Sequence, residues 1–148
     1  MPGRSQLQLE DAWVTRLEFT SSAPTDLLET QANESYPRVS WELRRRPEDG
    51  AYLVQLKILD RRATTRLVLE MEGTFSFPEG MAENVQFRMS NVNGPTILYG
   101  IARGVIGSLT GFSAGGRYLL PSVNVVELAE RQDRRRLKRQ TQSTQSAT

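Results

Sequence analysis

The sequence lacks both cysteine and histidine in all of its 148 residues. Without cysteine there is no disulfide and no thiolate nucleophile, and without either residue the usual zinc sites lose their preferred ligands. The absence of histidine also excludes a Ser-His-Asp triad within the chain. These absences remove most catalytic and metal chemistry, so the sequence predicts a protein that is not an enzyme and binds no cofactor or metal.

Long apolar runs are missing as well. No run approaches the roughly 18 apolar residues of a membrane-spanning helix, and the start MPGRSQLQLEDAW has no apolar signal core. We therefore expect a cytoplasmic protein that does not insert into a membrane. Hydrophobic residues make up 38% and charged residues 24% of the chain, a composition typical of a globular domain.

Positive charge is concentrated at the end of the chain. The last 20 residues carry a net charge of +4, so the remaining residues carry −2 of the total of +2. We predict a disordered start at 1–5, a single domain at 6–130, and a basic helical extension with a disordered tail at 131–148, the tail being the low-complexity 140–148. A solvated helix is the favoured interpretation of the extension, which lacks aromatics for base stacking. Non-specific contact with nucleic acid or the ribosome is the alternative.

Four segments alternate apolar and polar residues with the period of half-buried strands, at 6–20, 38–46, 51–60 and 64–78. The first segment changes phase near Trp13 and Val14, which indicates a β-bulge. Short connections join the last three segments and favour an antiparallel meander. One face of that sheet is apolar and has to be covered.

The stretch 94–124 predicts a helix that opens at Gly94-Pro95 and breaks at Gly115-Gly116, followed by a second helix from 123 onward. The first helix has an apolar stripe of Leu98, Ala102, Val105, Leu109 and Phe112. A row of glycines lies beside it, at Gly100, Gly104, Gly107 and Gly111. Each helical glycine costs about 1 kcal/mol relative to alanine, so the row predicts close approach of another backbone. We favour an oligomer seam over packing within one chain. Four strands and then two helices make the α+β class.

Three short motifs resemble those of the SecB family of export chaperones, over a span of about 7–130. Residues 73–77, with Gly73 and Phe75, are similar to the family's GxFxI segment. Residues 95–103, with Leu98, Ala102 and Arg103, are similar to its first helix start, although Leu98-Tyr99-Gly100 replaces Phe-Pro-Tyr. Residues 120–125, with Pro121, Val123 and Asn124, are similar to its entry to the second helix, with one crossover proline in place of two.

The resemblance implies an ATP-independent holdase that binds unfolded client proteins, either for export or to protect an antitoxin. It implies a homotetramer, a dimer of dimers with the first helix at the central seam, and client grooves between the sheet and the crossover with the second helix. Family members that dock on SecA present an acidic sheet surface. Here the outward strand positions mix glutamates with Arg44, Lys57 and Arg66, so SecA docking does not follow.

A holdase needs exposed apolar surface, and seven side chains are candidates for client contact. They are Leu27, Leu28, Tyr36, Trp41, Tyr52, Tyr118 and Leu119. For Trp41 and Tyr52 the alternative is an ordinary place in the core.

Overall fold

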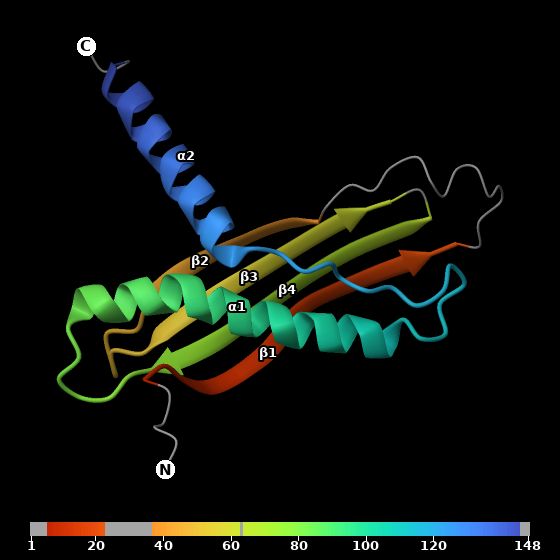
Figure 1. Ribbon diagram of the computed structural model, residues 1–148, viewed down its shortest axis with the longest axis horizontal. Helices are drawn as coiled ribbons and strands as arrows, with labels where there is room; N and C mark the ends of the chain where they lie inside the picture. Colours follow the sequence, from red (N-terminus) through yellow and green to blue (C-terminus); the bar gives the residue numbers. More distant parts are fainter. Residues whose placement is uncertain (1–5, 23–36, 63, 146–148) are drawn as a thin grey trace.

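A four-stranded antiparallel sheet forms one layer of the molecule, and a long helix lies across one of its faces (Figure 1). The computed structural model describes residues 6–22, 37–62 and 64–145. Its elements are β1 (Gln8–Ser21), β2 (Arg38–Arg45), β3 (Tyr52–Arg61), β4 (Thr65–Ser76), α1 (Glu83–Leu109) and α2 (Val125–Gln145). The predicted α+β class, with a four-stranded sheet followed by two helices, is confirmed.

The strand order is β1-β4-β3-β2. The last three strands form the predicted meander, and β1 pairs with β4 at the far edge. The register of β1 shifts twice, between Leu9 and Asp11 and between Val14 and Arg16. The second shift confirms the bulge predicted from the phase change. Together the shifts keep Leu9, Val14 and Leu17 on one face of the strand.

The core lies between α1 and the face of the sheet that it covers, called here the inner face. Strand β3 contributes Val54, Leu56 and Ile58, whose side chains are at most 2% exposed. Helix α1 contributes Leu98, Ala102 and Ile106, which recur every four residues and therefore lie on one side of the helix. Burying each large aliphatic side chain stabilises the fold by about 1.5–3 kcal/mol.

Helix α1 begins earlier than the sequence predicts. Gly94 and Pro95 lie in its interior, and both are buried, whereas the helix begins at Glu83. A Cβ added at Gly94 would lie only 2.9 Å from Val54 Cγ2, so the glycine allows the helix backbone to approach β3 closely. The Gly-Pro pair marks that contact rather than the start of the helix.

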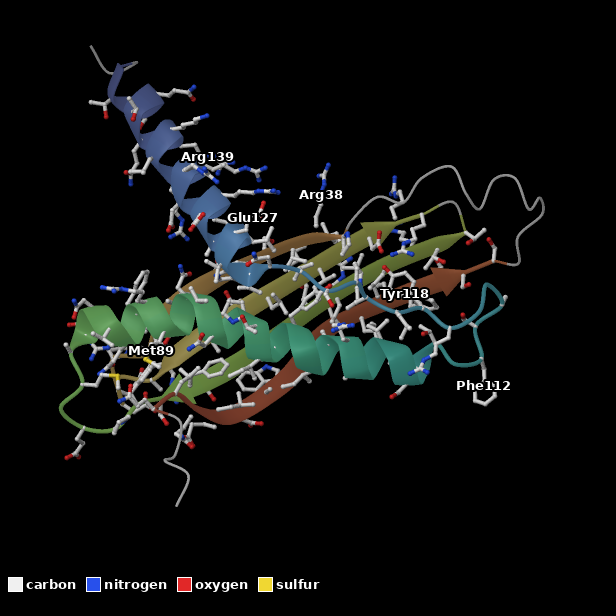
Figure 2. All side chains as sticks on the ribbon, viewed as in Figure 1. Arg38, Met89, Phe112, Tyr118, Glu127 and Arg139 are labelled. Atoms are coloured by element: carbon white, nitrogen blue, oxygen red, sulfur yellow. The ribbon has the colours of Figure 1, made fainter. Side chains whose placement is uncertain are left out.

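The end of α1 also differs from the predicted stripe. The helix ends at Leu109, whose side chain is 61% exposed. Phe112, in the following turn, is fully exposed and extends away from the body (Figure 2). Leu109 and Phe112 therefore do not reach the core. The buried stripe runs through Ile106 instead.

Helix α2 packs on the body only through its first turns and then projects away from it (Figure 1). Its N-terminus is capped by Asn124, whose Oδ1 accepts a hydrogen bond of 3.3 Å from the Glu127 backbone N–H. Val125 and Ala129 are each 6% exposed. The helix continues through 140–145, where the sequence predicts disorder. Within the described residues, neither helix is long and apolar enough to cross a membrane.

Two tyrosines beside the crossover allow a matched test of its packing. The Tyr99 hydroxyl donates a 2.5 Å hydrogen bond to the Pro121 carbonyl, whereas the buried Tyr118 hydroxyl has no hydrogen-bond partner among the described residues. We predict that Tyr99→Phe lowers the free energy of unfolding by about 1–2 kcal/mol, because it removes a hydrogen bond and leaves the carbonyl unpaired. Tyr118→Phe should be neutral or slightly stabilising. Urea unfolding of the two variants measures the difference, and equal losses would contradict this assignment.

Candidate binding surfaces

The three motifs of the sequence meet in space. A Cβ added at Gly73 on β4 would lie 2.7 Å from Leu98 Cδ2 on α1, so the first two motifs are in direct contact. The Arg103 Nε–H donates a 3.0 Å hydrogen bond to the Leu120 carbonyl, which joins the second motif to the third. With the bond from Tyr99 to Pro121, these contacts hold the crossover against α1.

Tyr118 belongs to this anchor rather than to an exposed surface. It is 6% exposed, and its backbone N–H donates a 2.9 Å hydrogen bond to Thr110 Oγ1. The Arg62 guanidinium lies 4.8 Å from the centre of the Tyr118 ring and pairs with Asp60 at 3.1 Å. The prediction of Tyr118 as an accessible client contact is therefore wrong, because its ring packs against Phe19 of β1 and Arg62.

The other predicted contact residues divide between the core and the surface. Trp41 is 4% exposed and donates a 3.0 Å hydrogen bond to Asn91 Oδ1. Tyr52 is 3% exposed, so for both aromatics the core alternative holds. Leu119 is 59% exposed on the crossover. Leu27, Leu28 and Tyr36 lie outside the residues that the structure describes.

A hollow of about 650 Å³ lies between the first turns of α1 and the β2–β3 hairpin. Phe87 stands at it with 47% of its surface exposed, and Leu43 and Tyr52 contribute apolar surface from the sheet. An ion pair of 2.6 Å between Arg45 and Glu83 spans the same two elements. Burial raises the pKa of Tyr52, which keeps its phenol neutral.

Sequence reasoning missed this hollow because it began the first helix at Gly94 and left 79–93 ambiguous, whereas α1 begins at Glu83. Three apolar residues in this segment, Val85, Phe87 and Met89, could have drawn attention to it. They alternate as in a strand, but the structure places them on α1. Val85 and Phe87 remain exposed, and Met89 is partly buried.

A second apolar surface runs along the inner face of β1, and we call it the β1 strip. Leu9, Val14 and Leu17 are 37–39% exposed, although their partners on β4 are buried. Helix α1 packs chiefly on β3 and β4 and leaves this edge uncovered. The β1 strip is apolar surface that this chain alone does not bury.

The four glycines do not form one open flank. Gly100 and Gly104 are exposed, and a Cβ added at either would meet nothing within 4 Å. Gly107 is covered by two side chains of the crossover, at 3.4 and 3.5 Å from an added Cβ. Gly111 lies beyond the end of α1. The open flank is therefore limited to Gly100 and Gly104.

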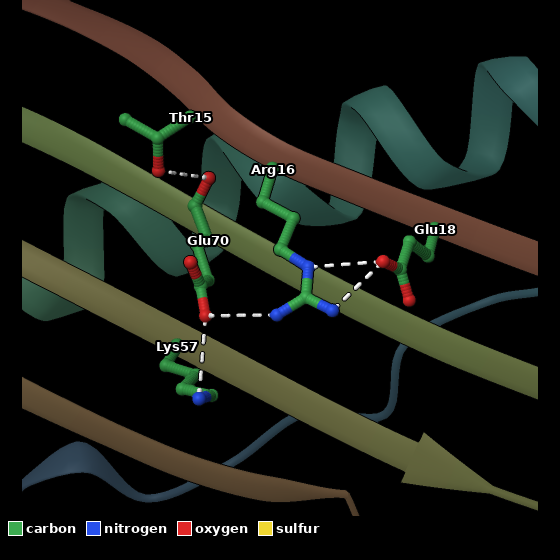
Figure 3. A network of polar contacts seen from close by, with 5 residues as sticks. All are labelled: Thr15, Arg16, Glu18, Lys57 and Glu70. Atoms are coloured by element: carbon green, nitrogen blue, oxygen red, sulfur yellow. Dashed lines mark hydrogen bonds and ion pairs between the residues drawn. The ribbon is translucent and has the colours of Figure 1, made fainter.

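The outer face of the sheet, opposite α1, carries a network of mixed charge (Figure 3). Arg16 donates hydrogen bonds of 3.1 and 2.7 Å to Glu18, and these bonds hold the pKa of Glu18 below its ordinary value and raise that of Arg16. Glu70 lies 3.2 Å from Lys57 and 3.9 Å from Arg16. Among the described residues, no group of three or more acidic side chains could hold a metal ion.

Comparison with known proteins identifies the fold. No protein-family model and no curated protein sequence matches the chain. Its structure is similar to that of the SecB-like chaperone Rv1957 of Mycobacterium tuberculosis, solved in complex with a ChAD peptide from the antitoxin HigA1 (Rv1956). The TM-score is 0.60 at 16% identity, over 80% of this chain and 90% of that one. A protein of unknown function from Streptococcus agalactiae matches with a TM-score of 0.46 at 12% identity, over 78% and 97% of the two chains.

The chain has the SecB-like fold, as its three motifs predict.

The open glycine flank leads to a prediction about assembly. Gly104 lies on the exposed side of α1, and a Cβ added there would meet nothing within 4 Å. If this flank meets a second subunit, Gly104→Leu should split a tetramer into dimers and leave the far-ultraviolet circular dichroism unchanged. Light scattering coupled to size exclusion measures the mass. Gln140→Leu, which adds the same side chain to the projecting part of α2, should keep the wild-type mass.

An unchanged mass for Gly104→Leu would show that the flank stays free in solution. A monomeric wild type would contradict the seam altogether.

Proposed function

We propose that this protein is an ATP-independent chaperone that holds unfolded or aggregation-prone proteins. The observation that carries the proposal is the exposed Phe87, which stands on a SecB-like fold at a hollow whose wall includes Leu43 and the buried Tyr52. A holdase needs apolar surface that stays exposed before its client arrives. It also needs contacts that adapt to many sequences rather than one shaped pocket.

Phe87 is the proposed anchor for clients. Exposed aromatics at a hollow carry a large share of binding energy when a partner desolvates them. Met89, partly buried on the same helix, adds a flexible side chain that adjusts to different partners. Leu119 on the crossover provides a second apolar contact.

Antitoxin protection is the proposed role that the Mycobacterium tuberculosis neighbour supports, because its structure holds an antitoxin peptide. Export is the other proposed role.

We further propose a cytoplasmic homotetramer in which the Gly100–Gly104 flank and the β1 strip lie at subunit contacts. Both surfaces are open in the single chain, and burying the strip would remove apolar area from water at about 25 cal/mol per Å². In this proposal, 6–130 is the chaperone domain and 131–148 is its basic extension.

The alternative is a binding module whose basic helix contacts nucleic acid or the ribosome. The projection of α2 away from the body favours it (Figure 1). Among the described residues, Arg131 pairs with Glu127, but five further cations on the helix have no ion pair. They are Arg134, Arg135, Arg136, Lys138 and Arg139. Truncation after Glu130 tests this alternative: loss of nucleic-acid retention without any chaperone activity would favour it.

The proposed anchor is tested by suppression of aggregation of a chemically denatured protein without ATP. We predict that Phe87→Ser weakens client binding about ten- to thirtyfold, because truncation of a central aromatic costs about 2 kcal/mol. Its matched control is Phe112→Ser, which removes a still more exposed ring, beyond the other end of α1. The control should suppress aggregation as the wild type does. Light scattering over time measures suppression, and anisotropy of a labelled unfolded client measures affinity.

Equal losses in the two variants would place the activity in general apolar exposure rather than in the hollow. A wild type that never slows aggregation would overturn the chaperone proposal.

A further inference from the structure

Three arginines gather at one end of the outer face, and we call them the arginine corner: Arg38, Arg61 and Arg66. In an antiparallel sheet the start of β2, the end of β3 and the start of β4 meet at one end, so residues far apart in sequence become neighbours. They line a hollow of about 490 Å³ together with Leu59, Leu67, Val68 and Asp60. Arg38 extends away from the body (Figure 2).

The register places like charges directly opposite each other. Arg61 pairs with Arg66 across the β3–β4 ladder, and Arg38 pairs with Leu59 across the β2–β3 ladder. Like charges in facing positions destabilise a sheet. Conversely, a negative group bound beside the exposed Arg66 would offset this repulsion.

The charges of the corner contrast with those beside it. One row further along the outer face, Glu70 lies between Lys57 and Arg16, so charges are neutralised (Figure 3). Among the described residues, Arg38 and Arg66 are exposed and have no ion pair or hydrogen bond. Asp60, which lines the same hollow, pairs with Arg62 at 3.1 Å, and Glu18 pairs with Arg16 at 2.7 Å.

A second hollow extends the corner toward β1. It measures about 250 Å³, and Arg61 and Arg66 line it too. Its other polar side chains are Arg62 and the hydroxyls of Thr20, Ser21, Ser22, Thr64 and Thr65. Hydroxyls and guanidinium groups are both hydrogen-bond donors to carboxylate oxygens.

We propose that the arginine corner is a docking surface for an acidic peptide segment of a partner protein. Guanidinium groups bind carboxylates with two parallel hydrogen bonds. In an extended peptide, side chains of one face recur every second residue, so acidic and aliphatic residues reach the arginines and Leu59 together. Leu59 is 36% exposed at the centre of the corner.

The lining favours a peptide over a nucleic acid. No described residue that lines either hollow is aromatic, whereas single-stranded nucleic acid is bound by stacking of its bases on aromatic side chains. The floor is aliphatic instead, and aliphatic side chains of a peptide fit it. This surface lies opposite α1 and apart from the Phe87 hollow, so the inference does not depend on chaperone activity.

The test uses the full chain and a labelled synthetic peptide in which glutamate and leucine alternate. The same peptide with glutamine in place of glutamate measures apolar binding elsewhere on the protein. Fluorescence anisotropy at low salt should show preference for the glutamate peptide, and high salt should reduce it, because exposed charges are screened over about 10 Å. The double variant Arg38→Gln with Arg66→Gln should lower that preference about tenfold, the sum of two exposed charge-assisted contacts.

Two matched controls remove the same charge elsewhere. Arg44→Gln with Arg88→Gln changes exposed arginines outside both hollows, and Arg134→Gln with Arg135→Gln changes the projecting helix. Both should keep the preference. An equal loss in either control would overturn the proposal, as would equal affinity of the wild type for the two peptides. A further outcome would also overturn it: the wild type shows no preference between the peptides but binds an oligothymidylate, and only the Arg38→Gln with Arg66→Gln variant loses that binding.

Discussion

The close approach of α1 to the sheet is the contact on which the other features depend. It is possible because glycine occupies both sides of it: Gly94 on the helix faces Val54, and Gly73 on the sheet faces Leu98. A methyl group at either site would force neighbouring side chains apart, and overpacking of this kind costs about 1–3 kcal/mol. The glycines thus set the line along which α1 crosses β3 and β4.

That line decides which apolar surface stays exposed. A single helix about 10 Å wide cannot cover four strands spaced about 4.8 Å apart. Helix α1 packs chiefly on β3 and β4, so the β1 strip and the Phe87 side chain at its hollow remain exposed. The crossover is held to α1 by Tyr99 and Arg103 and covers neither region. Exposed apolar surface in this fold is a consequence of the architecture rather than of a few misplaced residues.

The strands were predictable because a half-buried strand shows its period directly, as β3 does from Tyr52 to Asp60. The start of α1 was not predictable, because Gly94-Pro95 is also the usual sign of a helix beginning. Only the position of Val54 in the structure shows that Gly94 serves close packing inside the helix. The exposure of individual side chains was harder still to predict from the sequence. Tyr118 and Leu119 are adjacent on the crossover, yet Tyr118 is buried against Phe19 of β1 whereas Leu119 is 59% exposed. Such differences depend on contacts between distant segments, which local patterns do not contain.

The two faces of the sheet offer a partner different kinds of contact. The inner surfaces are apolar, so their contacts are non-directional and proportional to the area removed from water, which suits a partner without defined structure. On the outer face, pairing of opposite charges leaves little net field at Glu70, whereas Arg38 and Arg66 of the arginine corner are exposed and have no ion pair among the described residues. Charged surfaces discriminate among partners and accelerate encounter more than they add affinity. In the proposed function, varied clients bind on the inner face, and the arginine corner gives the outer face the means to recognise a particular acidic partner.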